Sequence, residues 1–236
     1  MRYSWNWAVL TTEPYFGYIV SGVEWTVLVS LASWSIAFTL GSVLGIARTV
    51  NNRTVRAVAG AYVEVFRNVP LLVQIFLWYH VVPALIPAFK GLPAFVLVVF
   101  ALGFFTSARI AEQVRAGIQS LPRGQMLAGT ALGLTLPQTY RFVILPMTFR
   151  IILPPLTSEF LNCIKNSSVA LTIGVMELTA SARSMQEFSF QFFEAFTAAT
   201  IIYLFANIIV VFGMRWLEQR VRVPGFIGSV PVQTAH

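Results

Sequence analysis

Five long stretches of the chain consist almost entirely of apolar residues, and shorter polar segments separate them. A helix needs roughly 20 residues to cross a hydrocarbon core of about 30 Å, and each stretch reaches that length. The apolar residues do not alternate with polar ones, as they do in the strands of membrane barrels. The pattern predicts an all-α integral membrane protein with five transmembrane helices, near residues 19–46, 57–82, 93–114, 151–176 and 195–217.

The composition agrees with this prediction. Of the 236 residues, 57% are hydrophobic and only 11% are charged, whereas roughly a quarter are charged in a soluble domain. The N-terminal segment lacks the basic and then apolar layout of a cleaved signal peptide, so we expect the first span to be retained. Residues 1–236 are interpreted as one membrane domain. The lone Cys163 is interpreted as a small buried residue, since one cysteine provides neither a disulfide nor a thiolate cluster.

The net charge of +7 is unevenly distributed along the chain. Basic residues of membrane proteins gather on the cytoplasmic side, so this charge indicates membrane orientation and not a nucleic-acid partner. We predict a multi-pass protein of the bacterial cytoplasmic membrane, with the N-terminus outside and the C-terminus in the cytoplasm. The evidence is ten arginines between spans one and two, between spans three and four, and after span five: Arg48, Arg53, Arg56, Arg115, Arg123, Arg141, Arg150, Arg215, Arg220 and Arg222.

The longest predicted inner connection covers residues 120–146 and contains several helix breakers. Between these breakers we expect a short helix over 125–134, and another turn or two over 136–143 that leads back toward the membrane. One interpretation is a simple linker. The other is a docking surface for a second protein, which is favoured because apolar residues such as Leu127 and Leu132 are rimmed by arginines.

The run Leu-Ala-Gly-Thr-Ala-Leu-Gly at 127–133, followed by Val-Ile-Leu-Pro at 143–146, resembles the EAA loop of bacterial ABC importer permeases. That loop reads Glu-Ala-Ala, three residues, Gly, nine residues, an aliphatic residue, one residue and Leu-Pro, and the spacing fits without a gap. The resemblance implies the type I importer permease fold, with a cytoplasmic coupling helix that inserts into an ATPase subunit. Two departures, Leu127 for Glu and Gly129 for Ala, preserve docking but remove any salt bridge from position 127. The resemblance assigns ATPase coupling to Leu127, Ala128, Gly129, Gly133, Leu145 and Pro146.

Further segments resemble the polar amino-acid importers within that family, chiefly Glu-Val-Phe-Arg-Asn-Val-Pro-Leu-Leu-Val-Gln at 64–74 and the run at 108–118. Trp-Asn-Trp at 5–7 and Lys-Asn-Ser-Ser at 165–168 are similar to glutamate/aspartate permeases. The resemblance covers roughly residues 17–223 and implies import of a polar, acidic amino acid by alternating access. The implied partners are two ATP-binding subunits, an identical or homologous permease subunit, an external solute-binding protein and membrane lipid.

Charged residues inside predicted spans require a partner, an aqueous cavity or a place near the interface. Glu64 and Arg67 lie three residues apart and can pair on one helix face, and Glu112 can reach Arg109 or Arg115 by the same spacing. Structural pairing near the cytoplasmic helix ends is one interpretation of these residues. Contact with the substrate is the other.

The fourth span carries five polar residues within an arc of about 120°. We propose that this face lines a substrate pathway, in which Lys165 attracts a carboxylate and the two asparagines offer amide groups. In the alternative, Lys165 pairs with Glu159 or with a neighbouring subunit and stabilises the helix bundle. The five candidate pathway residues are Ser158, Glu159, Asn162, Lys165 and Asn166.

Motifs of catalysis are missing from the sequence: it contains no G-x-x-x-x-G-K-[ST], no H-E-x-x-H and no G-x-S-x-G. We therefore expect no catalytic residues, no metal site and no cofactor, and we place ATP hydrolysis on partner chains. The leading alternative is a secondary transporter driven by an ion gradient, but such folds show inverted repeats and more helices. A membrane scaffold without transport activity would have no need of the polar face on span four.

Overall fold

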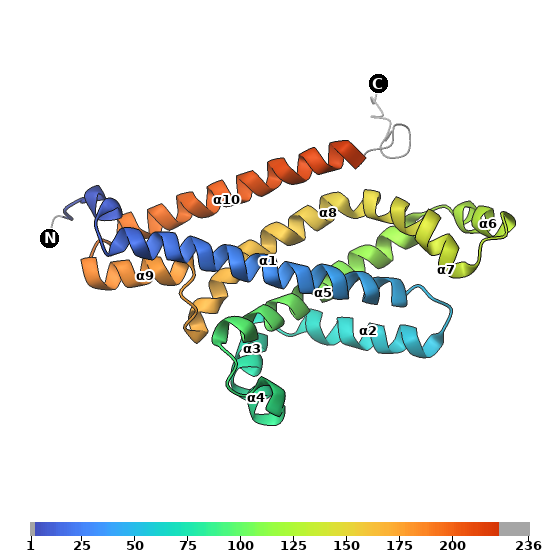
Figure 1. Cartoon of the computed structure of the whole chain (residues 1–236), viewed down its shortest axis with the longest axis horizontal. Coiled ribbons are helices and arrows are strands. Elements are labelled where there is room, and N and C mark those ends of the chain that lie inside the picture. Colours follow the sequence, from blue (N-terminus) through green and yellow to red (C-terminus); the bar gives the residue numbers. More distant parts are fainter. Residues whose placement is uncertain (1–2, 222–236) are drawn as a thin grey trace, which may run out of the picture.

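The computed structural model describes residues 3–221, and all the regular elements in that range are helical (Figure 1). Arg2, Arg222, His236 and the predicted placement of the C-terminus lie outside the described residues. The α-helices are α1 (Tyr15–Ala47), α2 (Arg53–Asn68), α3 (Leu71–Phe76), α4 (Val82–Leu85), α5 (Ala94–Ser120), α6 (Arg123–Ala131), α7 (Leu136–Thr139), α8 (Leu145–Asn166), α9 (Leu178–Ser189) and α10 (Phe192–Val221). Shorter 3-10 segments cover Trp7–Thr11, Pro87–Phe89 and Ser167–Ile173, and π-helical turns cover Leu77–Val81 and Tyr140–Ile144.

Four helical segments in the described range are long and apolar enough to cross a membrane. Three of them are α1, α5 and α10, which confirm the predicted spans one, three and five. The fourth runs without interruption from Leu136 to Ile173 and contains α8, so the predicted fourth span begins well after the helix does. The proline pair at 154–155 lies inside this helix, and the helix continues past it.

The predicted second span, over 57–82, falls on a sharply bent pair of helices that is long and apolar enough to cross a membrane only when both are taken together. The chain turns by 104° between α2 and the segment that contains α3 and α4. Pro70 has no N–H and restricts the residue before it, and Val69 is accordingly extended, with φ −89° and ψ 130°. The Gln74 side chain donates to the carbonyls of Phe66 (2.8 Å) and Val69 (3.0 Å), which satisfies the last turn of α2.

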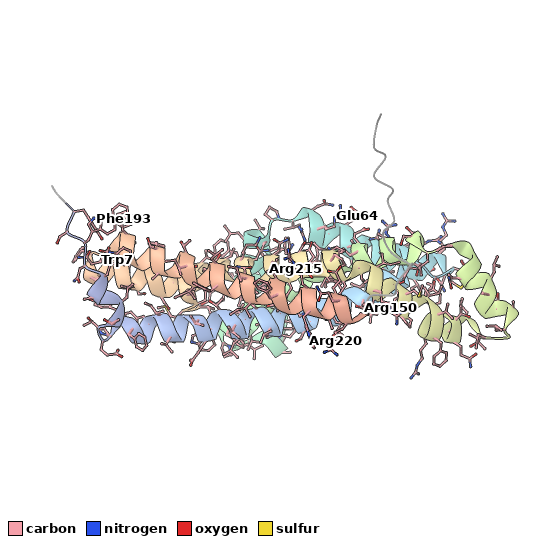
Figure 2. All side chains as sticks on the ribbon, turned by 90° about the horizontal axis from the view of Figure 1, so that it is seen from above. Trp7, Glu64, Arg150, Phe193, Arg215 and Arg220 are labelled. Atoms are coloured by element: carbon pink, nitrogen blue, oxygen red, sulfur yellow. The ribbon has the colours of Figure 1, made fainter. Side chains whose placement is uncertain are left out.

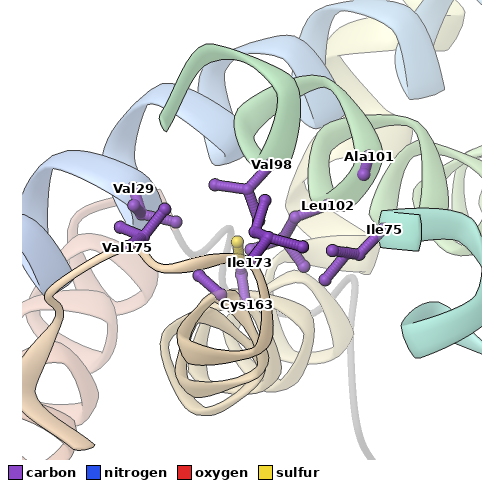
Figure 3. Packing of buried hydrophobic residues seen from close by; sticks show 9 residues of the cluster. Val29, Ile75, Val98, Ala101, Leu102, Cys163, Ile173 and Val175 are labelled. Atoms are coloured by element: carbon purple, nitrogen blue, oxygen red, sulfur yellow. The ribbon is translucent and has the colours of Figure 1, made fainter. Parts of the chain in front are cut away.

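Helix α5 lies at the centre of the bundle and packs against α1, α2, α3 and α8. Glycine permits close contacts of this kind, because a Cβ atom at Gly45 of α1 would lie 2.6 Å from the Cβ of Val114 on α5. Figure 3 shows the largest buried apolar cluster, in which Val29 of α1, Leu102 of α5 and Cys163 of α8 meet. Cys163 is buried there, as its sequence context predicted.

The two ends of the bundle differ in chemistry. Trp7 and Phe193 lie at one end in Figure 2, and the labelled arginines Arg150 and Arg220 lie in the opposite half. Further along the bundle, Glu177 caps α9 by accepting from the backbone N–H groups of Thr179 and Ala180, both at 2.9 Å. Burial raises the pKa of the Glu177 carboxyl, and these hydrogen bonds oppose that effect.

Candidate functional site: the terminal loop and the charged helix faces

Residues 120–146 fold back on the bundle as two short helices, α6 and α7, at one end of the long axis (Figure 1). The predicted short helix is confirmed, with bounds two to three residues earlier than expected. Helix α6 ends at Ala131, and two residues later Gly133 turns the chain with a φ of 77°, which favours glycine. The N–H of Gly133 donates to Thr130 O (3.0 Å) and the N–H of Leu134 donates to Gly129 O (3.1 Å), the pattern of a glycine-terminated helix.

Gly129 faces inward and not toward solvent. A Cβ atom at this position would lie 2.5 Å from Thr139 Cγ2 and 2.9 Å from Thr139 Oγ1. No side chain fits where α6 crosses α7, which gives a physical reason for glycine where related loops have alanine. Of the predicted coupling residues, Gly129 therefore positions α6, and its neighbours form the outer surface.

The outer surface of α6 is apolar and open. Leu127 is 67% exposed and Leu132 is 80% exposed, and Ala128 and Gly133 are exposed beside them. Leucine side chains exposed to this degree on one short helix are typical of a protein docking surface. Docking of a second protein on this surface stays a prediction.

Leu145 and Pro146 lie apart from that surface, at the start of α8, where Leu145 is half-buried and Pro146 is exposed. Proline removes one backbone donor, and the chain takes a π-helical turn over Tyr140–Ile144 immediately before it. The helix is not interrupted there, so α7 and α8 form one continuous rod. The predicted coupling residues thus divide between the outer face of α6, its inner contact with α7 and the base of this rod.

The polar face of α8 is present as predicted, but its residues have different surroundings. Glu159 is 6% exposed, and Arg109 of α5 binds it through Nε (2.7 Å) and Nη2 (3.1 Å), with Gln113 Nε2 at 3.2 Å. Lys165 and Ser158 are exposed. Asn162 and Asn166 are half-buried.

The predicted alternative pairing of Lys165 with Glu159 is wrong within this chain. The two residues are six positions apart, which separates them by about 120° around the helix axis. Glu159 lies at the edge of the polar arc that meets α5, whereas Lys165 lies at the opposite edge. Lys165 is thus the cation on this face that is open to solvent or to a ligand, while the carboxylate of Glu159 is engaged.

A second charged cluster joins three helices around Glu112 of α5. Its carboxylate contacts Arg48 at the end of α1, Arg67 Nη1 of α2 at 3.3 Å and Arg115 Nη2 of α5 at 2.7 Å. The predicted pair of Glu112 and Arg115 is confirmed. Three guanidinium groups share one carboxylate, so the cluster retains a surplus of two positive charges.

The predicted pair of Glu64 and Arg67 is wrong. Glu64 accepts instead from Asn68 Nδ2 at 3.1 Å, while Arg67 turns toward Glu112 on another helix. Spacing along one helix cannot reveal partners on a neighbouring helix, and for this reason sequence reasoning missed both the Arg109 to Glu159 contact and the Arg48 to Glu112 contact. The sequence signals these contacts only indirectly, because an unpaired charge inside an apolar span has a high free-energy cost and therefore requires some partner.

Within residues 3–221, no group of three or more His, Cys, Asp or Glu side chains lies close enough to hold a metal ion. The arrangement offers an exposed apolar helix, a continuous rod behind it and charged contacts that join the rod to its neighbours. These features suit mechanical coupling and ligand binding.

Comparison with known proteins gives consistent results. Residues 37–223 match the family described as "Binding-protein-dependent transport system inner membrane component". The chain is 44% identical to the glutamate/aspartate import permease protein GltJ of Escherichia coli (strain K12), over 97% of this chain and 100% of that protein. It is 30% identical to the glutamine transport system permease protein GlnP of the same strain, over 94% of this chain and 100% of the relative. A solved structure described as "Crystal structure of an amino acid ABC transporter with histidines" superposes with a TM-score of 0.79 at 30% identity, covering 93% of this chain and 100% of that one.

Proposed function

The chain belongs to the inner membrane components of binding-protein-dependent transport systems, and we propose from this that it is the permease subunit of an ATP-driven importer for acidic amino acids. Support for the substrate comes from the similarity to a glutamate/aspartate permease and from the exposed cation Lys165 on the polar face of α8. Family membership argues against the alternative of a secondary transporter driven by an ion gradient. This chain breaks no covalent bond in the proposal, and hydrolysis takes place on partner subunits.

The observation that carries the proposal is the exposed face of α6. Apolar surface costs about 25 cal/mol per Å² when it is left in water, so the open side chains of Leu127 and Leu132 favour burial against a partner. The inward contact between Gly129 and Thr139 seats the helix on the bundle. Two ATP-binding subunits are the proposed partners of α6, one beneath this chain and one beneath an identical or homologous permease subunit.

The distribution of charge supports a cytoplasmic location for α6. Arg48, Arg56, Arg115 and Arg141 belong to the helix ends and loops that surround it. By the positive-inside rule that end faces the cytoplasm, and the N-terminal end of α1 faces the exterior, where a solute-binding protein delivers the amino acid. Residues 1–236 then form a single permease domain, whose coupling loop is 120–146.

The proposed transport cycle is alternating access. Closure of the ATPase subunits draws the two α6 helices of the permease pair together, which tilts the helices above them and opens the path outward. Ser158, Asn162, Lys165 and Asn166 line that path in the proposal, with Lys165 opposite a substrate carboxylate. Glu159 belongs to the same face but acts on Arg109, not on the substrate.

Cross-linking in the assembled, reconstituted transporter tests the docking surface. We expect a Leu127→Cys variant to be cross-linked to an ATP-binding subunit and a Leu85→Cys variant not to be. Leu85 is 75% exposed and lies between the second and third spans, on the proposed outer side, so it serves as a matched control. Failure of Leu127→Cys to capture an ATP-binding chain, in a complex that hydrolyses ATP, would refute the assignment.

Uptake measurements test the substrate pathway. In vesicles without an ion gradient, we expect ATP-dependent uptake of glutamate to show an apparent KM raised about tenfold or more by Lys165→Met, the loss typical of a hydrogen bond to a charged group. Lys90→Met is the control, because Lys90 is exposed in the loop before α5. An unchanged KM and maximal rate for Lys165→Met would remove Lys165 from the pathway and leave the coupling role of α6 intact.

A further inference from the structure

A cavity of about 680 Å³ lies behind α6, on the side that faces the bundle. It is bounded by the end of α1, the start of α2, the end of α5 and the π-helical turn before α8. Its polar wall carries Arg48, Arg56 and Gln119, together with the hydroxyl groups of Thr49 and Tyr140, which lie 3.2 Å apart. No acidic side chain of the described residues 3–221 lines it.

The polar wall carries excess positive charge. Arg48 belongs to the cluster in which three guanidinium groups share the single carboxylate of Glu112. Arg115 of that cluster also donates from Nη1 to Gln119 Oε1 (2.6 Å), which brings the cluster directly to the cavity wall. Arg56 is exposed, and in the described part of the chain it has no carboxylate within ion-pair distance.

The rest of the lining is apolar. Ile118, Leu121, Met126 and Ile144 contribute to it, and all four belong to the buried cluster between α5 and α8 or pack against that cluster. The cavity lies at the end of α1, and the end of a membrane-spanning helix marks a membrane boundary. It therefore combines a cationic rim with an apolar floor at the depth of lipid headgroups.

We propose that this cavity binds the headgroup of an anionic phospholipid, with the phosphate between Arg48 and Arg56 and the glycerol and proximal acyl carbons against Ile118 and Ile144. Arginine pairs bind phosphate through charge-assisted hydrogen bonds, and basic pockets between membrane helices are typical sites for anionic headgroups. A free acidic amino acid matches the rim but has no apolar body for the floor. An acidic protein segment is the second competing occupant, and the experiments below distinguish both from a lipid.

Occupancy has a mechanical consequence, because the cavity wall includes Met126 and Leu127 of α6. A lipid bound there contacts Met126 and the adjoining edge of Leu127, while Leu132 on the exposed face of the helix stays free. It joins α6 to the ends of α1, α2 and α5. Anionic lipid is therefore expected to increase the coupling of ATP hydrolysis to transport.

Native mass spectrometry of the whole transporter tests the site. The complex is reconstituted in nanodiscs of phosphatidylcholine with a rising fraction of phosphatidylglycerol, and the retained lipids are counted. We expect Arg56→Gln to weaken phosphatidylglycerol retention about fivefold, the usual effect of one basic side chain near an anionic lipid. Arg56→Lys should restore most of it. Arg53→Gln is the matched control, since Arg53 is also an exposed arginine at the start of α2 but does not line the cavity.

Three outcomes would overturn the proposal. Equal phosphatidylglycerol retention by the Arg56→Gln, Arg53→Gln and unaltered complexes would exclude a lipid at this site. Displacement of the lipid by free glutamate or inorganic phosphate at cytosolic concentrations would indicate a soluble anion. Capture of an ATP-binding subunit, and not of lipid, by a photoreactive group at Met126 would indicate a protein occupant. Lipid counting does not depend on uptake, so it succeeds or fails separately from the proposed transport function.

Discussion

Replacement of Gly129 by alanine tests whether α6 is held by its close approach to α7. The added Cβ atom would lie 2.5 Å from Thr139 Cγ2 and 2.9 Å from Thr139 Oγ1, and side chains do not approach this closely in proteins. Gly124 provides a matched control in the same helix, because a Cβ atom there would have nothing within 4 Å. Both substitutions add one methyl group to α6, and only one of them meets α7.

The expected magnitudes separate the two variants. Replacing glycine by alanine stabilises a helix by up to about 1 kcal/mol, and this gain is common to both positions. Overpacking costs about 1 to 3 kcal/mol, and it applies only at Gly129. Gly124→Ala should therefore leave α6 as stable as before or more stable, whereas Gly129→Ala should be less stable than Gly124→Ala by about 1 to 3 kcal/mol. This difference corresponds to a factor of roughly 5 to 150 in the equilibrium for local opening.

Amide hydrogen exchange of α6 in the whole complex measures that equilibrium, and ATP-driven uptake measures its consequence. A second substitution, Thr139→Ala, removes both of the closest atoms and leaves only the Cβ of residue 139, at 3.2 Å. The double variant with Gly129→Ala should recover protection of α6 and part of the uptake. Equal protection in Gly129→Ala and Gly124→Ala, or no recovery in the double variant, would show that the contact between α6 and α7 does not hold α6 in place.

Three further predictions concern contacts within and between the other helices. Arg109→Met leaves the buried Glu159 carboxylate without its cation and should destabilise the purified complex by about 3 to 5 kcal/mol, seen as thermal aggregation at lower temperature; an unchanged melting profile would contradict this. Gly45→Leu should separate α1 from α5 and reduce the yield of assembled complex. Gly60→Leu should not reduce it, because nothing lies within 4 Å of a Cβ atom at Gly60, and equal yields of the two variants would refute the reasoning. Glu177→Ala removes the cap of α9 and should cost about 0.5 to 2 kcal/mol, measured as faster amide exchange in the first turn of α9; exchange that is unchanged there would argue against the cap.

Sequence reasoning succeeded where a single physical quantity decides the structure. The length of an apolar run is set by the thickness of the bilayer, and this is why α1, α5 and α10 lie where hydropathy predicted them. The short helix α6 was found from its breakers, because Gly133 ends it with a positive φ. An exposed apolar surface on α6 was predicted because a simple linker has no need of apolar residues, and Leu127 and Leu132 are exposed.

Sequence reasoning failed where local chemistry competes with hydropathy. The bend at Pro70 was visible in the sequence as a proline inside an apolar run, but a hydropathy window counts proline only as one more residue. The fourth helix extends back to Leu136 because a π-helical turn carries the chain past Pro146, and apolar length alone contains no information about that turn. The inward contact of Gly129 depends on the crossing of two short helices, which spacing along the chain does not encode.

The described contacts connect α6 to the membrane helices by two stiff routes. Only Leu121 and Pro122 separate α6 from the end of α5, and proline restricts the backbone there. On the other side, α7 continues through the π-helical turn into α8 as one helix. A displacement of α6 therefore acts on α5 and α8 together, since neither route contains a long flexible segment.

Helices α5 and α8 are in turn joined to each other and to their neighbours. Arg109 of α5 binds Glu159 of α8, and Gly117 of α5 lets Ile152 of α8 approach so closely that an added Cβ would lie 2.4 Å from it. One turn along α5, Glu112 joins it to α1 and α2. Because packed helices shift as bodies and do not deform continuously, a load applied at the exposed leucines of α6 is expected to reach α5 and α8 together and, through them, the helices packed on α5. The polar face that carries Lys165 lies on α8, so in the proposed transport cycle a movement of α6 is transmitted to that face.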